Sequence, residues 1–176
     1  LYDVFAEQAI ALERGGADAC LVETMSAIDE ASIAIRAIRE NTKLETLCTF
    51  TFERNNRGEF RTMMGVSPSD MARELSLAGA DIIGTNCGNG MERMAPIVRE
   101  IRAAAPAGKP IIVNANAGMP AQRDGRTVFP ETPEAMAKLV PDIIRAGASV
   151  IGGCCGTTPA HIAAIARAVK GIIPSA

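Results

Sequence analysis

The amino-acid sequence predicts a parallel α/β fold built from about five β/α units. The first observation behind this prediction is an internal repeat. In each copy a helix ends at glycine, a short polar turn follows, and an apolar strand ends in a polar or thiol residue. The repeat occurs at 16–23, 79–87 and 147–154. The second observation is the spacing of the copies, which is too wide for one β/α unit and leaves room for two. Short apolar strands that alternate with helices are typical of parallel sheets.

Five strands follow from this pattern. Three of them are the apolar runs that end at Glu23, Cys87 and Cys154. The other two are the runs Leu44–Phe52 and Pro110–Asn116, which fill the gaps between the copies. The chain therefore supplies five strands, each expected to run in the same direction as its neighbours.

Helix signals lie between the strands. Ser67, Thr132 and Thr158 each stand directly before a proline, which is the pattern of an N-cap followed by proline at the first helical position. A further helix follows Ser26, where apolar residues recur on one face. Pro141 is expected to kink or split the helix that begins after Thr132, because proline lacks the N–H that the helix interior uses.

Composition and charge exclude several classes of function. The 176 residues are 48% hydrophobic and 22% charged, with a net charge of −2. Such a balance is typical of a soluble globular protein and gives no footprint for nucleic acid or for an anionic membrane surface. No apolar run approaches the roughly 20 residues of a membrane span, and no leader of basic and then apolar residues is visible.

The five cysteines indicate a reducing compartment. Their number is odd, and Cys20 and Cys48 lie inside apolar runs, where cysteine usually acts as a small buried hydrophobe. A disulfide framework is therefore not expected, and we expect a cytoplasmic protein with free thiols.

Polar and thiol residues gather where the predicted strands end. Because the carboxyl ends of parallel strands meet at one rim, these side chains are expected to face the same mouth. They are Glu23, Thr51, Asn86, Cys87, Asn116, Cys154 and Cys155. Two long loops, 53–67 and 118–131, follow strands at the same rim.

Three thiols at this rim favour a zinc site with one open coordination position, which is typical of catalytic zinc. Consecutive strand residues point to opposite faces, so Cys154 and Cys155 share a metal only where the strand breaks. Gly152, Gly153 and Gly156 supply the conformational freedom for such a break. Two other interpretations remain open from the residues alone: a redox-active disulfide between the adjacent cysteines with Cys87 buried elsewhere, or three inert cysteines.

The cysteine motifs resemble those of the homocysteine S-methyltransferase family, which includes the homocysteine-binding module of cobalamin-dependent methionine synthase and betaine–homocysteine methyltransferase. The resemblance rests first on Gly84–Cys87 and Gly152–Ile162. It extends through Leu21–Thr24, Arg61–Thr62 and Val113–Gly118 in the same order, and so covers essentially the whole chain.

This resemblance implies a (β/α)₈ TIM barrel, of which residues 1–176 form about five C-terminal β/α units. It implies a Zn²⁺ site held by Cys87, Cys154 and Cys155, which activates the thiol of homocysteine for methyl transfer and so forms methionine. Asn116 would lie beside the metal and fill its open position before substrate arrives.

The resemblance also implies substrate contacts. Glu23 matches an acid near the homocysteine ammonium, and Asn86 and Thr51 match positions that shape the pocket. His161, in the first turn of the last helix, is expected to be a surface or packing residue and not a zinc ligand.

The sequence differs from the family pattern in the number of its β/α units. Five units do not close an eight-stranded barrel, so the first strand is expected to present an open edge. The missing units are expected in a longer chain that has been truncated or processed, or in another chain, including a second copy. The motifs Asn116–Gly118 and Glu131–Glu134 are closer to the cobalamin-dependent branch, with methylcobalamin carried on a separate corrinoid domain or protein. The alternatives are betaine or S-methylmethionine as donor, or a catalytically silent fragment that binds zinc or a partner.

Overall fold

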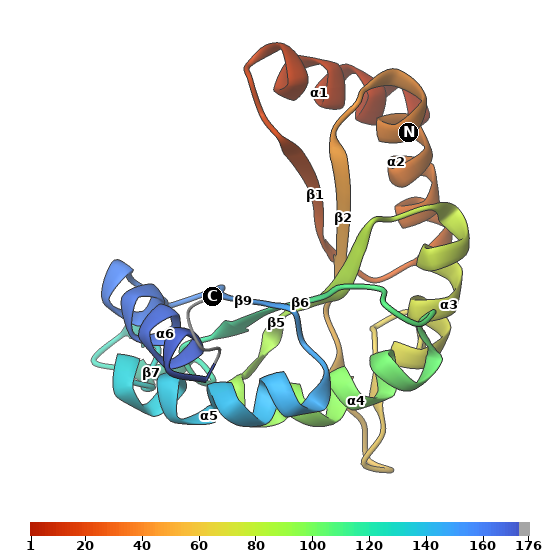
Figure 1. The fold of residues 1–176 in the computed structure, drawn as a ribbon. Coiled ribbons are helices and arrows are strands. Elements are labelled where there is room, and N and C mark those ends of the chain that lie inside the picture. Colours follow the sequence, from red (N-terminus) through yellow and green to blue (C-terminus); the bar gives the residue numbers. More distant parts are fainter. Residues whose placement is uncertain (173–176) are drawn as a thin grey trace.

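The sheet has the five parallel strands that the sequence predicts, and they lie side by side in chain order. The computed structural model describes residues 1–172. The strands of the main sheet are β1 (Ala19–Met25), β2 (Glu45–Phe50), β5 (Ile82–Gly90), β6 (Ile111–Asn116) and β9 (Val150–Gly153). Figure 1 shows that the sheet is strongly bent, with the helices along its outer side. The carboxyl ends of the strands therefore share one rim of an open, curved sheet.

The helices begin and end largely where the cap residues predict. They are α1 (Tyr2–Arg14), α2 (Ile28–Asn41), α3 (Pro68–Ala78), α4 (Met94–Ala104), α5 (Pro133–Ala146) and α6 (Pro159–Ile172), with a short 3₁₀ turn, η1 (Met91–Arg93), before α4. The Ser67 hydroxyl accepts the N–H of Asp70 at 3.0 Å, which caps α3. The same helix ends at Gly79, whose φ of 96° is left-handed.

The sequence predicts that Pro141 kinks or splits its helix. The predicted split is wrong, because α5 is continuous from Pro133 to Ala146. Met136, Val140 and Ile143 are buried on one face of α5. This apolar stripe spans both sides of the proline, so packing against the sheet holds the two halves in one helix.

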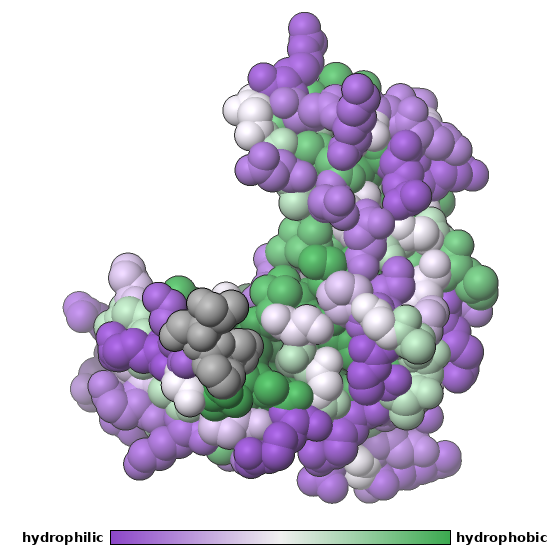
Figure 2. Space-filling model, in the orientation of Figure 1, coloured by the Kyte–Doolittle hydropathy of each residue, from purple (hydrophilic) through white to green (hydrophobic). Residues whose placement is uncertain are grey.

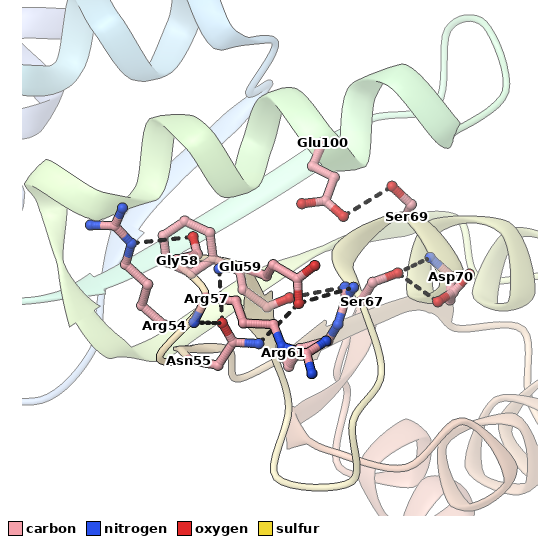
Figure 3. A network of polar contacts seen from close by, with 11 residues as sticks. Arg54, Asn55, Arg57, Gly58, Glu59, Arg61, Ser67, Ser69, Asp70 and Glu100 are labelled. Carbon is pink, nitrogen blue, oxygen red and sulfur yellow. Dashed lines mark hydrogen bonds and ion pairs between the residues drawn. The ribbon is translucent and has the colours of Figure 1, made fainter.

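Both long loops contain a short hairpin that the sequence analysis did not predict. The first pairs β3 (Glu53–Arg54) with β4 (Phe60–Arg61), and the second pairs β7 (Ala121–Arg123) with β8 (Arg126–Val128). In the first hairpin the Asn55 side chain accepts the backbone N–H groups of the turn, and Figure 3 shows the polar network around it. Each long loop therefore contains an antiparallel pair of short strands.

The hydrophobic core lies between the sheet and the outer helices. Its largest fully buried side chains come from both layers: Ile35, Phe50, Phe52, Met71, Leu75, Ile83, Met91, Met94, Ile97, Ile101, Ile111 and Met136. Cys48 is also fully buried there. Within residues 1–172, no helix is both long enough and apolar enough to cross a membrane.

The two lateral edges of the sheet are open within the described residues. Strands β1 and β9 each have a single neighbouring strand. Ile162 of α6, which helical spacing places on an inward face, is 45% exposed beside Val150 and Ile151 of β9. Its apolar side chain lies beside the open β9 edge. Figure 2 shows hydrophobic residues at the inside of the bend.

Candidate metal centre

The fold brings the three rim thiols together. Cys87 lies in β5, and Cys154 and Cys155 follow β9 directly. The Cys155 sulfur lies 3.7 Å from that of Cys87 and 3.9 Å from that of Cys154, and all three sulfurs lie within 4.8 Å of one another. Tetrahedral zinc with Zn–S bonds of about 2.3 Å places its sulfurs about 3.8 Å apart. Two sides of the thiol triangle therefore match the edge of a tetrahedral zinc site, and the third is no longer than 4.8 Å.

The adjacent cysteines share this triangle because β9 ends in a turn anchored to β6. The Cys154 N–H donates to the carbonyl of Ala115 at 2.8 Å, and the Ala117 N–H donates to the carbonyl of Cys155 at 2.9 Å. The backbone and hydroxyl of Thr157 both donate to the Cys154 carbonyl, at 3.1 and 2.7 Å. The strand therefore breaks where the two thiols must turn to the same side.

Two glycines of this turn have no room for a side chain. A Cβ on Gly156 would lie 2.2 Å from the ring of Phe129, and the φ of Gly156 is 79°. A Cβ on Gly153 would lie 2.5 Å from the Thr157 methyl group. The predicted break of the strand is thus confirmed, and close packing as well as backbone conformation requires glycine there.

Cys87 is also placed by an irregular backbone. Its φ is 55°, in the left-handed region that side chains other than glycine seldom adopt, and Gly88 follows with a φ of 65°. The pairing of β5 with β6 is interrupted between Asn86 and Gly90. Thr51 supports this bend, because its hydroxyl donates to the Asn86 carbonyl at 3.0 Å.

Asn116 lies beside the cysteine pair. It is almost fully buried, and its side-chain oxygen accepts the N–H of Cys155 at 3.1 Å. Asn86 lies behind the cluster, is fully buried, and points its side-chain nitrogen at the Cys154 sulfur, 3.9 Å away.

Glu23 has a partner that the sequence analysis missed. Its carboxylate accepts the side-chain N–H of Asn114 at 3.3 Å. The two residues come from β1 and β6, which are not neighbours in the sheet, so the contact crosses the concave side. Asn114 stands two residues before Asn116. Strand residues two apart lie on the same face, so the position of Asn114 beside the rim could have been predicted.

The Cys155 thiol favours its protonated form when no cation is present. Burial, a hydrogen bond with Cys87 and the proximity of Cys154 raise the pKa of Cys155 to about 11. A divalent cation would offset this cost, because thiolates and not thiols bind metals. The interpretation with Cys87 buried elsewhere does not fit, since the fold places all three thiols together.

His161 has a structural role, as expected. It is 7% exposed, and its Nδ1 accepts the backbone N–H of Thr158 at 3.1 Å. This bond leaves the proton on Nε2, which donates to the carbonyl of Glu131 at 3.0 Å. Both ring nitrogens are engaged, and the residue lies outside the thiol cluster.

Comparison with known proteins identifies relatives of this chain. The sequence profile of homocysteine S-methyltransferases matches residues 1–169. Methionine synthase of Mycobacterium tuberculosis is 32% identical over 176 residues, which are 97% of this chain and 14% of that protein. Methionine synthase of Mycobacterium leprae is 30% identical over 182 residues, covering 98% of this chain and 15% of that protein. The chain thus spans about one seventh of the length of these relatives.

Solved structures share the fold. The apo and metallated forms of the homocysteine methyltransferase MmuM from Escherichia coli both superpose with a TM-score of 0.72. They are 23% and 24% identical to this chain, and each match covers 95% of it. The matches cover 57% of the apo chain and 52% of the metallated chain.

Proposed function

The chain belongs to the homocysteine S-methyltransferase family, and we propose that it carries the zinc half of an active site that methylates homocysteine to methionine. The observation that carries the proposal is the triangle of Cys87, Cys154 and Cys155 at the strand rim. The free thiols also fit the reducing cytoplasm that the cysteine pattern predicts.

The three thiols form the metal-binding set of the proposed site. Zn²⁺ bound there would lower the pKa of a substrate thiol while leaving its sulfur electron-rich. In the transfer itself a lone pair of the homocysteine sulfur forms the new S–CH₃ bond. The electron pair of the broken donor–CH₃ bond stays with the donor. The distances from the Cys155 sulfur to the other two sulfurs support zinc, since both match the edge of a tetrahedral site.

The remaining rim residues orient the cluster and the substrate. Asn116 holds the backbone of Cys155, and we assign its side-chain oxygen as the fourth zinc ligand in the absence of homocysteine. Glu23 is exposed on the concave side, where its carboxylate is free to bind the homocysteine ammonium with Asn114 alongside. A carboxylate facing an ammonium forms a charge-assisted hydrogen bond, which is stronger than a neutral one.

The proposed domain is a (β/α)₈ barrel to which residues 1–176 contribute about five units. The two open edges at β1 and β9 and the exposed Ile162 support completion by further β/α units. These units belong to the same polypeptide in this proposal, and a second copy or another chain is the alternative source. Light scattering of the intact protein separates the two, because a monomer excludes completion in trans.

The proposed methyl donor is a corrinoid carried on another domain or protein, with methylcobalamin as the reactive form. The methionine synthase relatives are several times longer than this chain, which leaves room in them for further domains. Betaine and S-methylmethionine are the alternative donors for the same chemistry. A silent fragment that binds zinc or a partner is the alternative outside catalysis.

The test uses the intact protein loaded with zinc, incubated with homocysteine and one donor at a time, with methionine measured by mass spectrometry. We expect methionine with methylcobalamin and none after a chelator has removed the zinc. Methionine formed only with betaine or S-methylmethionine would reassign the donor. Bound zinc without methionine from any donor would favour the silent fragment and reject the proposed catalysis.

A further inference from the structure

Asn86 occupies a position that joins the two halves of the proposed site. It directly precedes Cys87 in β5, is fully buried, and its side chain contacts residues of β1, β2 and the turn after β9. A buried amide of this kind is stable only when its polar atoms have partners.

The orientation of the Asn86 amide is fixed by its partners. The backbone N–H of Thr24 lies 3.1 Å from the side-chain oxygen, and the Thr49 hydroxyl lies 2.8 Å from the same atom. A backbone N–H only donates, so the atom that faces it must be the oxygen. The nitrogen therefore faces the Thr24 hydroxyl at 2.8 Å and the Cys154 sulfur at 3.9 Å.

Thr24 needs the support that Asn86 gives it. Its φ is 65°, which is left-handed, and the pairing of β1 with β2 is irregular between Val22 and Met25. A β-branched residue in this region is strained and persists only where its surroundings hold it. Two hydrogen bonds hold Thr24 to Asn86: the Thr24 N–H donates to the Asn86 side-chain oxygen, and the Asn86 side-chain nitrogen donates to the Thr24 hydroxyl. Thr24 directly follows Glu23.

We infer that Asn86 is a positioning residue that couples substrate recognition at Glu23 to the thiol cluster through Thr24 on one side and the Cys154 sulfur on the other. This inference rests on the proposed function. Its N–H directed at sulfur stabilises negative charge on Cys154, as partners of metal ligands commonly do. Its bonds to Thr24 set the backbone from which Glu23 projects into the concave side.

Substitutions can separate the two contacts of Asn86, the one with Thr24 and the one with the Cys154 sulfur. Asn86→Asp keeps an oxygen facing the Thr24 N–H and Thr49, but at pH 8 its carboxylate offers no N–H to the Cys154 sulfur. Thr24→Val keeps the branched shape and removes the hydroxyl that accepts from the Asn86 side chain. Thr49→Val is the matched control, since Thr49 bonds the Asn86 oxygen and makes no hydrogen bond with the sulfur.

The test titrates Co²⁺ into the intact, metal-free protein and follows the sulfur-to-cobalt charge-transfer band, with Zn²⁺ affinity measured by competition with a chelator. We expect Asn86→Asp to lower the affinity for both metals by about 10- to 100-fold and to shift the band. Thr24→Val should leave metal affinity unchanged and weaken homocysteine binding, read as the spectral change on its addition, by about 2- to 10-fold, the effect of one lost hydrogen bond. Thr49→Val should change the metal affinity by less than Asn86→Asp does.

The outcomes distinguish this inference from the proposed function. Wild-type protein that binds neither metal through the cysteines overturns both. Wild-type protein that binds them, with Asn86→Asp unchanged in affinity and band, overturns the role of Asn86 alone. Circular dichroism of each variant checks folding, and Asn86→Leu provides a second substitution that removes the N–H without adding charge. Wild-type metal affinity in a folded Asn86→Leu protein also contradicts the inference.

Discussion

The core and the rim of this molecule use the same residue type in opposite ways. Cys48 lies in the middle of β2, in register with Val22 and Ile83 of the neighbouring strands, and is fully buried. Burial raises its pKa to about 12, so it remains a neutral packing residue. At the rim, Cys87 and Cys155 stand where strand pairing is interrupted or has ended, and their sulfurs lie 3.7 Å apart.

The difference shows that backbone irregularity, and not residue type, distinguishes the clustered rim thiols from a packing thiol here. A regular strand sends successive side chains to opposite faces and so keeps thiols apart. Left-handed residues and close-packed glycines at the rim break that alternation and bring three thiols from distant segments together. The predictions below test this contrast.

The largest effect is expected from exchanging a rim thiol for alanine and comparing it with a core thiol. Cys87→Ala should lower zinc affinity by more than about 100-fold, beyond the range typical of residues that only contact metal ligands. Cys48→Ala should leave zinc affinity unchanged and lower the free energy of unfolding by about 1 kcal/mol, because a small buried group is lost. Chelator competition and denaturant unfolding measure the two effects. Full zinc content and activity in Cys87→Ala would refute the site.

Asn116 and Asn114 offer a comparison within one strand of the rim. Asn116→Ala removes the proposed fourth zinc ligand as well as the bond to the Cys155 N–H, and should lower zinc affinity by about 10- to 100-fold or more. Asn114→Ala, two residues earlier, should leave zinc affinity unchanged, because Asn114 contacts Glu23 and not the cysteine turn. Equal zinc affinities of the two variants would show that Asn116 does not support the cluster.

Two carboxylates toward opposite ends of the neighbouring strands β1 and β2 separate substrate binding from surface charge. Glu23→Gln should raise the KM for homocysteine by about 10-fold or more, as expected for the loss of a hydrogen bond to a charged group. Glu45→Gln removes an equal charge from the exposed first residue of β2 and should leave KM unchanged. Steady-state kinetics at fixed donor concentration measure both values. The same KM for the wild type and Glu23→Gln would remove Glu23 from the substrate site.

The last prediction concerns the core thiol and pH. The ordinary cysteine pKa of 9.0 is raised to about 12 at Cys48. Above pH 9 the unfolded chain loses this proton while the folded chain keeps it, so the stabilisation present below pH 9 is lost as pH rises toward 12. The expected slope contributed by Cys48 is up to about 1.4 kcal/mol of unfolding free energy per pH unit. Chemical unfolding of metal-free protein between pH 8 and 10.5 measures it, with Cys48→Ala expected to flatten the profile. Identical slopes in both proteins would contradict a neutral buried thiol.

The sequence predicted the five parallel strands from local patterns, and it predicted the thiol cluster because the carboxyl ends of parallel strands share one rim. Apolar runs predict the strands. The glycines around Cys154 and Cys155 predict the break in the strand that lets the two thiols turn to the same side. The caps of α3 and α5 were likewise visible as Ser67 and Thr132 before proline.

The features that were missed depend on tertiary packing or on turn chemistry that was overlooked. The Glu23–Asn114 contact crosses the concave side between strands that are not neighbours, which no local pattern reveals. Continuity of α5 through Pro141 depends on burial against the sheet. The hairpin at Asp124–Gly125 could have been predicted, because Asp-Gly between two short strands is a strong turn signal.

The measurement that tests the central claim most directly is X-ray absorption at the zinc edge of the intact protein, with and without homocysteine. The account predicts one zinc with three sulfur neighbours at about 2.3 Å and one lighter neighbour, and a fourth sulfur after homocysteine is added. A protein that holds no zinc, or a zinc with fewer than three sulfur neighbours, would contradict the account.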